Sequence, residues 1–137
     1  MKFLSHSPSE TEDFAFDFAK TLTCPAIVCL CGDLGAGKTA FTRGLCKYYG
    51  IETGVSSPTF IIMHRYEGKE VINHYDLYRV NDYDELVDIG FDEQLCEGIN
   101  VIEWPDDFMD ELPDDKIIIK ISRTHQGDEQ RLIEVID

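Results

Sequence analysis

Basic residues are scarce in this 137-residue chain, which has 12 Lys and Arg against 27 Asp and Glu and a formal net charge of −15 at pH 7. A surface with this charge repels polyanions, so we expect no direct binding of DNA, and any role with nucleic acid should be indirect. The sequence has no apolar run long enough to span a bilayer, and its amino terminus has no basic and apolar leader. We therefore expect a soluble, cytoplasmic protein that does not bind a membrane.

Cysteine pairs of the Cys-x-x-Cys type are also missing. The five cysteines are odd in number and occur in a chain without a leader, which favours reduced thiols. Cys29 and Cys31 lie two residues apart and share one face of a predicted strand, where small buried side chains are a better explanation than a metal site. The four histidines show no ligand spacing. The length fits one domain, residues 1–137, with no room for a separate substrate domain.

A glycine-rich segment is the strongest signal that is present. Residues 32–39 read Gly-Asp-Leu-Gly-Ala-Gly-Lys-Thr and match the P-loop pattern Gly-x-x-x-x-Gly-Lys-Ser/Thr. Glycines let the backbone N–H groups approach the phosphates, Lys38 would reach the β and γ oxygens, and Thr39 would offer its hydroxyl to Mg²⁺. The apolar run 26–31 before the loop predicts a buried strand, and residues 41–49 after it have helical periodicity. The sequence therefore predicts a nucleotide-binding strand–loop–helix unit.

The rest of the chain alternates between helical and strand patterns. Local patterns predict a helix at 10–22 with a capping box from Ser9, hairpin strands at 60–66 and 71–76, short helices at 82–86 and 92–96, a buried strand at 99–103, an exposed acidic turn or short helix at 106–115, and final strands at 116–123 and 130–136. These elements indicate an α/β protein with a P-loop NTPase-like three-layer fold and a mixed parallel and antiparallel central sheet.

Two carboxylates could complete the site. Glu103 ends an apolar strand as a Walker-B acid does, and Asp76 ends the second hairpin strand. If their strands are parallel neighbours of the P-loop strand, both side chains converge with Gly32 at the carboxyl edge of the sheet. Asp76 could instead cap a turn or pair with Arg79, and Glu103 could instead cap a helix.

Two further signals bear on the nucleotide. Thr59 follows Pro58 in a loop, where a hydroxyl could sense the γ-phosphate, while Trp104 more often packs than stacks on a base. The Asn-Lys-x-Asp signature of GTPases is absent, which favours ATP.

Four motifs in order resemble one family. They are residues 32–39, Ser-Pro-Thr-Phe at 57–60, His-Tyr-Asp-Leu-Tyr-Arg at 74–79 and Glu-Trp-Pro at 103–105, and together they are similar to the TsaE (YjeE) family, the bacterial ATPase of tRNA threonylcarbamoyladenosine synthesis. The resemblance implies weak magnesium-dependent ATPase activity that partners stimulate, and work in a complex with the TsaD and TsaB proteins.

The resemblance also assigns roles to residues. Carried onto this sequence, it implies phosphate binding by Leu34, Gly35, Ala36, Gly37, Lys38 and Thr39, Mg²⁺ binding by Thr39 and Glu103, catalysis near the γ-phosphate by Asp76, Thr59 and Lys38, and adenine contacts from the amino-terminal segment and from Gly127. Ala40 departs from the hydroxyl residue that many relatives carry there.

The expected function is thus an ATP-hydrolysing accessory subunit with ATP and Mg²⁺ as cofactors. Two alternatives remain open at this level, a small-molecule P-loop kinase and a nucleotide-dependent switch that does not hydrolyse ATP. A kinase needs cations around the transferred group, and the five arginines of this chain are spread along it with no basic lid segment.

Overall fold

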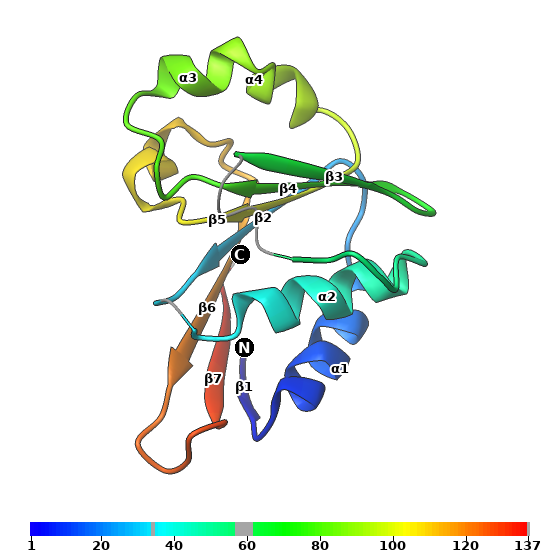
Figure 1. Ribbon diagram of the computed structural model, residues 1–137, viewed down its shortest axis with the longest axis vertical. Helices are drawn as coiled ribbons and strands as arrows, with labels where there is room; N and C mark the ends of the chain where they lie inside the picture. Colours follow the sequence, from blue (N-terminus) through cyan, green and yellow to red (C-terminus); the bar gives the residue numbers. More distant parts are fainter. Residues whose placement is uncertain (34, 57–61, 137) are drawn as a thin grey trace.

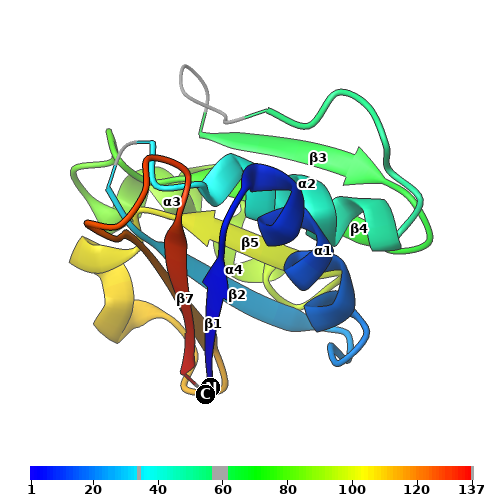
Figure 2. The same cartoon turned by 90° about the horizontal axis from the view of Figure 1, so that it is seen from below.

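The central feature of the computed structural model, which describes residues 1–33, 35–56 and 62–136, is a seven-stranded sheet with helices on both faces (Figures 1 and 2). The strands are β1 (Lys2–Ser5), β2 (Ala26–Cys31), β3 (Met63–Glu67), β4 (Val71–Asp76), β5 (Ile99–Glu103), β6 (Ile117–Arg123) and β7 (Arg131–Ile136). The helices are α1 (Pro8–Ala19), α2 (Lys38–Tyr48), α3 (Tyr83–Asp88), α4 (Phe91–Gln94) and the 3-10 helix η1 (Asp106–Glu111). The predicted three-layer α/β fold is confirmed.

The sheet is parallel at its centre and antiparallel toward its edges. Its strand order is β1-β7-β6-β2-β5-β4-β3, in which β2 runs parallel to β5 and β6, and β4 runs parallel to β5. β3, β7 and β1 each pair antiparallel with a neighbour. Because β2, β5 and β4 are parallel neighbours, their carboxyl ends lie together at one edge of the sheet, which is where ligands bind in such folds.

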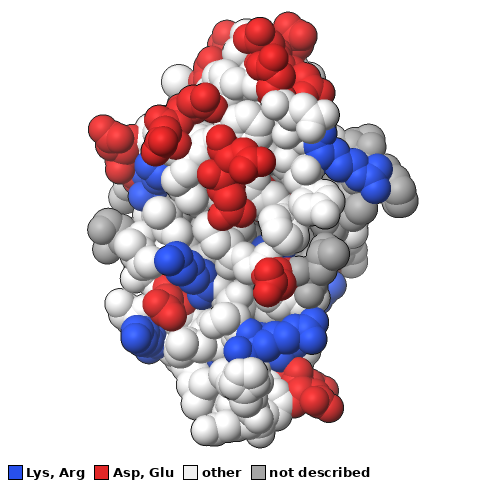
Figure 3. Space-filling model, turned by 90° about the vertical axis from the view of Figure 1, so that its left-hand side faces the viewer, with Lys and Arg blue, Asp and Glu red and all other residues white. Residues whose placement is uncertain are grey.

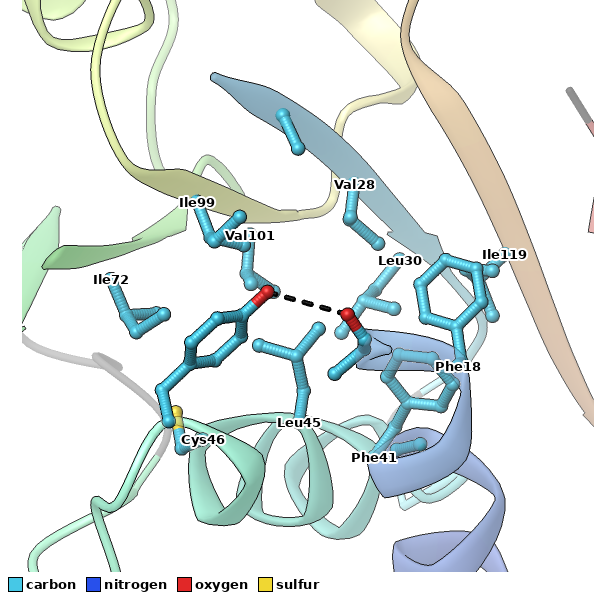
Figure 4. Close-up of a cluster of buried hydrophobic side chains, with 14 of the residues drawn as sticks. Phe18, Val28, Leu30, Phe41, Leu45, Cys46, Ile72, Ile99, Val101 and Ile119 are labelled. Carbon is cyan, nitrogen blue, oxygen red and sulfur yellow. Dashed lines mark hydrogen bonds between the residues drawn. The ribbon is translucent and has the colours of Figure 1, made fainter. Parts of the chain in front are cut away.

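β2 is buried on both faces, which explains why its sequence is apolar throughout. Val28 and Leu30 face α1 and α2, whereas Ile27 and Cys29 face α3, α4 and η1. Figure 4 shows Phe18 of α1 together with Phe41 and Leu45 of α2 packed toward the strands on the first of these faces. β2 therefore lies between two apolar layers, one on each face of the sheet.

The first helix begins and ends earlier than its sequence predicts. Its N-cap is Ser7, whose hydroxyl accepts the backbone N–H of Glu10 at 3.1 Å, so the predicted capping box at Ser9 is wrong. Pro8 takes the first helical position, where its missing N–H costs nothing. The helix ends at Ala19, and Leu22 lies beyond it in a turn against the core.

Other predicted elements match within a few residues. β1 is a four-residue edge strand that pairs with β7. Its residues show no alternation of apolar and polar side chains, so the sequence does not predict it. The first hairpin strand is described from Met63, and predicted residues 60 and 61 lie outside the described residues. Within the described part of the chain, none of the helices combines the length and apolar character needed to cross a bilayer.

Candidate nucleotide-binding site

The loop between β2 and α2 has the backbone shape that a phosphate cradle requires. Gly35 and Gly37 have φ angles of +75° and +112°, which only glycine adopts without strain. A Cβ atom on Gly35 would lie 2.4 Å from Nη2 of Arg123, so a side chain there would also displace the end of this arginine. Gly37 is the N-cap of α2, so the positive end of this helix faces the loop. Because Gly37 has no side chain, it does not cap the first N–H groups of the helix itself. Leu34, the remaining predicted loop residue, lies outside the described residues.

Lys38 carries an ammonium group that is buried without a hydrogen-bond partner among the described residues. The residue is 6 % exposed, and its Nζ lies 3.6 Å from the centroid of the Trp104 ring. Burial lowers the pKa of this amine, while the nearby carboxylates of Glu103 and Asp76 oppose the shift. An ammonium group that has no hydrogen-bond acceptor, beside a glycine cradle, is suited to an incoming phosphate oxygen.

The register of the sheet brings the two predicted carboxylates together. Glu103 lies beside Leu30 of the P-loop strand on one side and beside Asp76 on the other. The predicted convergence of Gly32, Asp76 and Glu103 at one edge of the sheet is therefore confirmed. This edge can combine a phosphate cradle with two acids.

Asp76 is half-buried at the end of β4. One of its oxygens, Oδ1, accepts the backbone N–H of Tyr78 at 3.0 Å, so the alternative that Asp76 caps a turn is also correct. Burial raises the pKa of this carboxyl, the Tyr78 N–H opposes the shift, and the charge of Glu103 adds to it. A carboxyl with a raised pKa is better suited to accept a proton than an exposed one.

Glu103 is held by a histidine that the sequence did not identify. The Nε2 atom of His74 lies 2.5 Å from Oε2 of Glu103, and both residues are buried. The alternative that Glu103 caps a helix is wrong, because Pro105 is the N-cap of η1. Two signals were available in the sequence. His74 is the first residue of the motif at 74–79, and it precedes Asp76 by two residues and so lies on the same face of β4.

Trp104 lies over the site and does not belong to the main core. It is the one non-glycine residue with positive φ among the described residues, at +56°, and its ring contacts the ring of Tyr78 with centroids 4.9 Å apart. Its second contact is with Lys38. Trp104 thus packs on Tyr78 and Lys38 at the surface of the site, outside both clusters of buried apolar side chains.

The other predicted site residues are placed as follows. Thr39 is half-buried in the first turn of α2, Gly127 lies in the turn between β6 and β7, where its carbonyl accepts the N–H of Gln130 at 3.3 Å, and Thr59 lies outside the described residues. Beside the loop is a hollow of about 350 Å³, whose lining includes Cys31, Gly32 and Asp33 together with Lys120, Ser122 and Arg123 of β6. Lys120 and Arg123 therefore place two cationic side chains beside the phosphate cradle.

The residues present fit a magnesium ion that shares its ligands with a nucleotide. Mg²⁺ prefers one or two protein oxygens together with phosphate oxygens and water, and Thr39 and Glu103 can supply such oxygens. Among the described residues, no group of three or more His, Cys, Asp or Glu side chains could hold a metal alone. Cys29 and Cys31 are free thiols whose pKa values burial raises to about 12 and about 11, so both remain protonated at neutral pH.

Comparisons with known proteins agree with these features. Residues 5–133 match the sequence model of the family described as Threonylcarbamoyl adenosine biosynthesis protein TsaE. A protein of Rickettsia bellii, named tRNA threonylcarbamoyladenosine biosynthesis protein TsaE, is 37% identical over 132 residues, which cover 95% of this chain and 90% of that protein. A protein of the same name from Bacillus subtilis is 37% identical over 135 residues, covering 97% and 83%.

A solved structure gives the same result for the fold. The crystal structure of YdiB from Bacillus subtilis superposes with a TM-score of 0.78 at 33% identity, covering 97% of this chain and 82% of that one. The matched region includes the glycine loop and the two acid-ending strands described above. The chain therefore belongs to the TsaE family.

Proposed function

We propose that this protein binds and hydrolyses ATP with Mg²⁺ as an accessory subunit in tRNA threonylcarbamoyladenosine biosynthesis, acting on the TsaD–TsaB transferase complex. The observation that carries the proposal is the buried ammonium group of Lys38, which lacks a hydrogen-bond partner among the described residues and lies beside a glycine cradle and two carboxylates. Family membership supplies the pathway, since the relatives are named for tRNA threonylcarbamoyladenosine biosynthesis.

Each part of the site has an assigned task. In this proposal residues 34–39 hold the phosphates, Thr39 and Glu103 hold the metal, Asp76 and Thr59 act near the γ-phosphate, and Gly127 lies near the adenine. A magnesium ion held there would supply positive charge that offsets the negative charge of the phosphates. Lys38 moves from the Trp104 ring to the β and γ oxygens when the nucleotide binds.

Asp76 is the residue that we assign to the attacking water. Its Oδ1 accepts the N–H of Tyr78, and this hydrogen bond orients the carboxylate. The other oxygen, Oδ2, is then the proton acceptor. The raised pKa of this carboxyl improves its match to a proton-transfer step near neutral pH. Glu103, held by His74, keeps its other oxygen, Oε1, for the metal.

A strongly asymmetric charge distribution supports docking on a basic protein surface. Of the 27 acidic residues, 14 lie in the 36 residues between Arg79 and Lys116, a stretch without Lys, Arg or His. This stretch forms α3, α4 and η1, which cover one face of the sheet, and Figure 3 shows acidic side chains gathered over the upper part of the molecule, where α3 and α4 lie in Figure 1. Complementary charge accelerates and orients association with a basic partner.

A reconstituted modification assay tests the function. With the transferase complex at substoichiometric amounts, adding this protein with ATP should increase the yield of modified tRNA over many turnovers. An unchanged yield would contradict the proposal. Single-turnover measurement with the partner present separates hydrolysis from a pure switch, which would leave the ATP intact, and phosphorylation of a metabolite without any protein partner would favour the kinase alternative.

The docking part of the proposal has its own matched control. A variant with Asp84→Asn and Asp88→Asn removes two charges from α3, and a variant with Asp13→Asn and Glu129→Gln removes two exposed charges elsewhere. The first should slow association with the transferase complex more than the second, and the difference should shrink in high salt. Equal association rates would argue against docking through the acidic stretch.

A further inference from the structure

One arginine outside the P-loop connects this loop to the turn between β6 and β7. Arg131, the first residue of β7, donates from Nε to the carbonyl of Ala36 at 2.9 Å and from Nη2 to the carbonyl of Gly35 at 3.3 Å. Its Nη1 donates to the carbonyls of Asp128 at 2.7 Å and Gln130 at 3.0 Å. A single guanidinium group therefore holds the P-loop and the turn between β6 and β7 together.

These contacts fix the direction of peptide units in the loop. A trans peptide unit is planar, so its carbonyl and its N–H point in opposite directions. The carbonyl of Gly35 belongs to the same unit as the N–H of Ala36, and the carbonyl of Ala36 belongs to the same unit as the N–H of Gly37. By holding both carbonyls on one side, Arg131 directs the two N–H groups to the other side of the loop. The N–H of Ala36 already donates to the carbonyl of Asp33, so the N–H of Gly37 is the one that Arg131 can direct toward a phosphate.

The described residues of the loop supply only part of this support. Gly35 and Gly37 have the largest conformational freedom of any residue type, and both adopt positive φ angles here. Within the loop, the N–H of Ala36 bonds to the carbonyl of Asp33 at 3.0 Å, which closes one turn. A site that is already ordered before binding loses less conformational entropy when the ligand arrives.

The chemistry of the contacts also distinguishes this residue. All four hydrogen bonds go to backbone carbonyl oxygens, and the donors Nε, Nη1 and Nη2 form the rigid planar fork that only arginine has. A lysine has a single ammonium nitrogen, so it could bond to one of these segments but not to the P-loop and the turn at the same time.

We propose that Arg131 is a positioning residue of the nucleotide site, which orders the Gly35–Gly37 segment for phosphate binding by holding its carbonyls from the outer side. The inference rests on the proposed nucleotide-binding function and deepens it. The guanidinium group acts through the loop backbone and does not itself touch the phosphates. It also couples the loop to the turn that contains Gly127, so the phosphate and adenine ends of the site are ordered together.

Nucleotide binding by three variants tests this role. Arg131→Met removes all four hydrogen bonds, Arg131→Lys keeps the charge and can form one of them, and Arg43→Met is a control on α2, where Arg43 pairs with Glu12 at 3.4 Å. The dissociation constant for ADP should be measured by calorimetry without magnesium, at about 50 and about 300 mM salt, with urea unfolding of each free protein.

Arg131→Met should weaken ADP binding by about tenfold and Arg131→Lys by about threefold, with Arg43→Met unchanged. The loss in Arg131→Lys should be the same at both salt concentrations, because this variant keeps the charge and the lost hydrogen bonds are to neutral carbonyls. Binding of ADP by Arg131→Met as tight as by the wild type would overturn the positioning role and leave Arg131 a structural tie. Full restoration by Arg131→Lys, or a loss in Arg131→Lys that shrinks in high salt, would overturn it in favour of a direct contact with phosphate.

A failure of the proposed nucleotide-binding function would give a different result from a failure of the role of Arg131. A wild-type protein that binds no ADP would overturn the proposed function and the role of Arg131 with it. If Arg131→Met unfolds, Arg131→Lys alone decides the question, because a positioning role requires a loss of affinity in a folded protein whose unfolding curve matches the wild type.

Discussion

The imidazole of His74 and the carboxylate of Glu103 form a buried hydrogen-bonded pair, with 2.5 Å between Nε2 and Oε2. The two residues lie diagonally across β4 and β5, because the register places Val101 beside His74 and Asp76 beside Glu103. The side chains of His74 and Glu103 are only 0% and 3% exposed, so water competes poorly for this contact. The pair fixes the direction of the acid that the proposed function assigns to the metal.

Removing the donor of this pair should weaken both folding and metal binding. His74→Phe leaves the Glu103 carboxylate buried without its partner, so the free energy of unfolding should fall by about 3 kcal/mol. The magnesium concentration that gives half-maximal ATP turnover should rise about tenfold, as is usual when a group that orients a metal ligand is lost. Urea unfolding and a magnesium titration measure the two effects.

Two further variants separate orientation from packing. His74→Gln can still place an Nε2 donor toward Glu103 and should recover most of the magnesium affinity. His64→Gln, on the neighbouring strand β3 and opposite His74 in the register, should leave the magnesium titration unchanged. If His74→Phe shows a normal magnesium titration, the pair has a structural role only, and if Glu103→Ala does so too, the metal ligand is Asp76.

Lys38 should be dispensable for folding and required for binding. Lys38→Met keeps the length of the side chain and removes a buried ammonium group whose pKa burial lowers, so the free protein should be no less stable than the wild type. The dissociation constant for ATP should rise at least about a hundredfold, because a charge-assisted contact with the β and γ oxygens is lost. Thermal unfolding and calorimetry check the two halves, and a variant that binds ATP normally would remove Lys38 from the site.

Trp104 should report phosphate binding through its fluorescence. It is the only tryptophan in the chain, and its ring lies 3.6 Å from the ammonium group that is expected to move to the phosphates. ADP and inorganic pyrophosphate should therefore cause the same change in emission, whereas adenosine should cause none. A response to adenosine and none to pyrophosphate would mean that the ring stacks on the base.

The sequence was most informative where a rule acts over short distances. The spacing of residues 32–39 predicts the loop, and the apolar runs before Gly32 and before Glu103 predict buried strands whose bounds the structure confirms. The convergence of Asp76 and Glu103 followed from one topological rule, that carboxyl ends of parallel neighbours share an edge.

What the sequence did not reveal depends on contacts between distant segments. His74 reaches a partner 29 residues away and Arg131 reaches carbonyls 95 and 96 residues away. His74 opens the motif at 74–79, but nothing in that motif gives its partner, and no local pattern marks Arg131. β1 has four residues and exists because β7 offers it an edge. The cap of α1 is different, because a local rule favours Ser7 over Ser9: Pro8 follows Ser7, and proline is favoured at the first helical position.

Asp76 should lower the stability of the free protein while it supports catalysis. Burial raises its pKa above the ordinary value of 3.8, so the native state disfavours the ionised form relative to the unfolded chain. This penalty is fully present above the native pKa and vanishes below pH 3.8, where both states are protonated. Asp76→Asn keeps the acceptor for the Tyr78 N–H and removes the charge, so at pH 7 and without nucleotide its Tm should exceed that of the wild type by a few degrees or so.

The pH dependence of the Tm and the loss of ATP turnover together show whether Asp76→Asn acts by removing the buried charge. The gain in Tm should shrink as the pH falls toward 3.8, and ATP turnover should drop by about 10² or more at every pH because the proton acceptor is gone. Asp13→Asn, an exposed position on α1, should change neither quantity. A constant gain in Tm across the pH range would mean that the substitution acts through packing, and retained turnover would assign the attacking water to another residue.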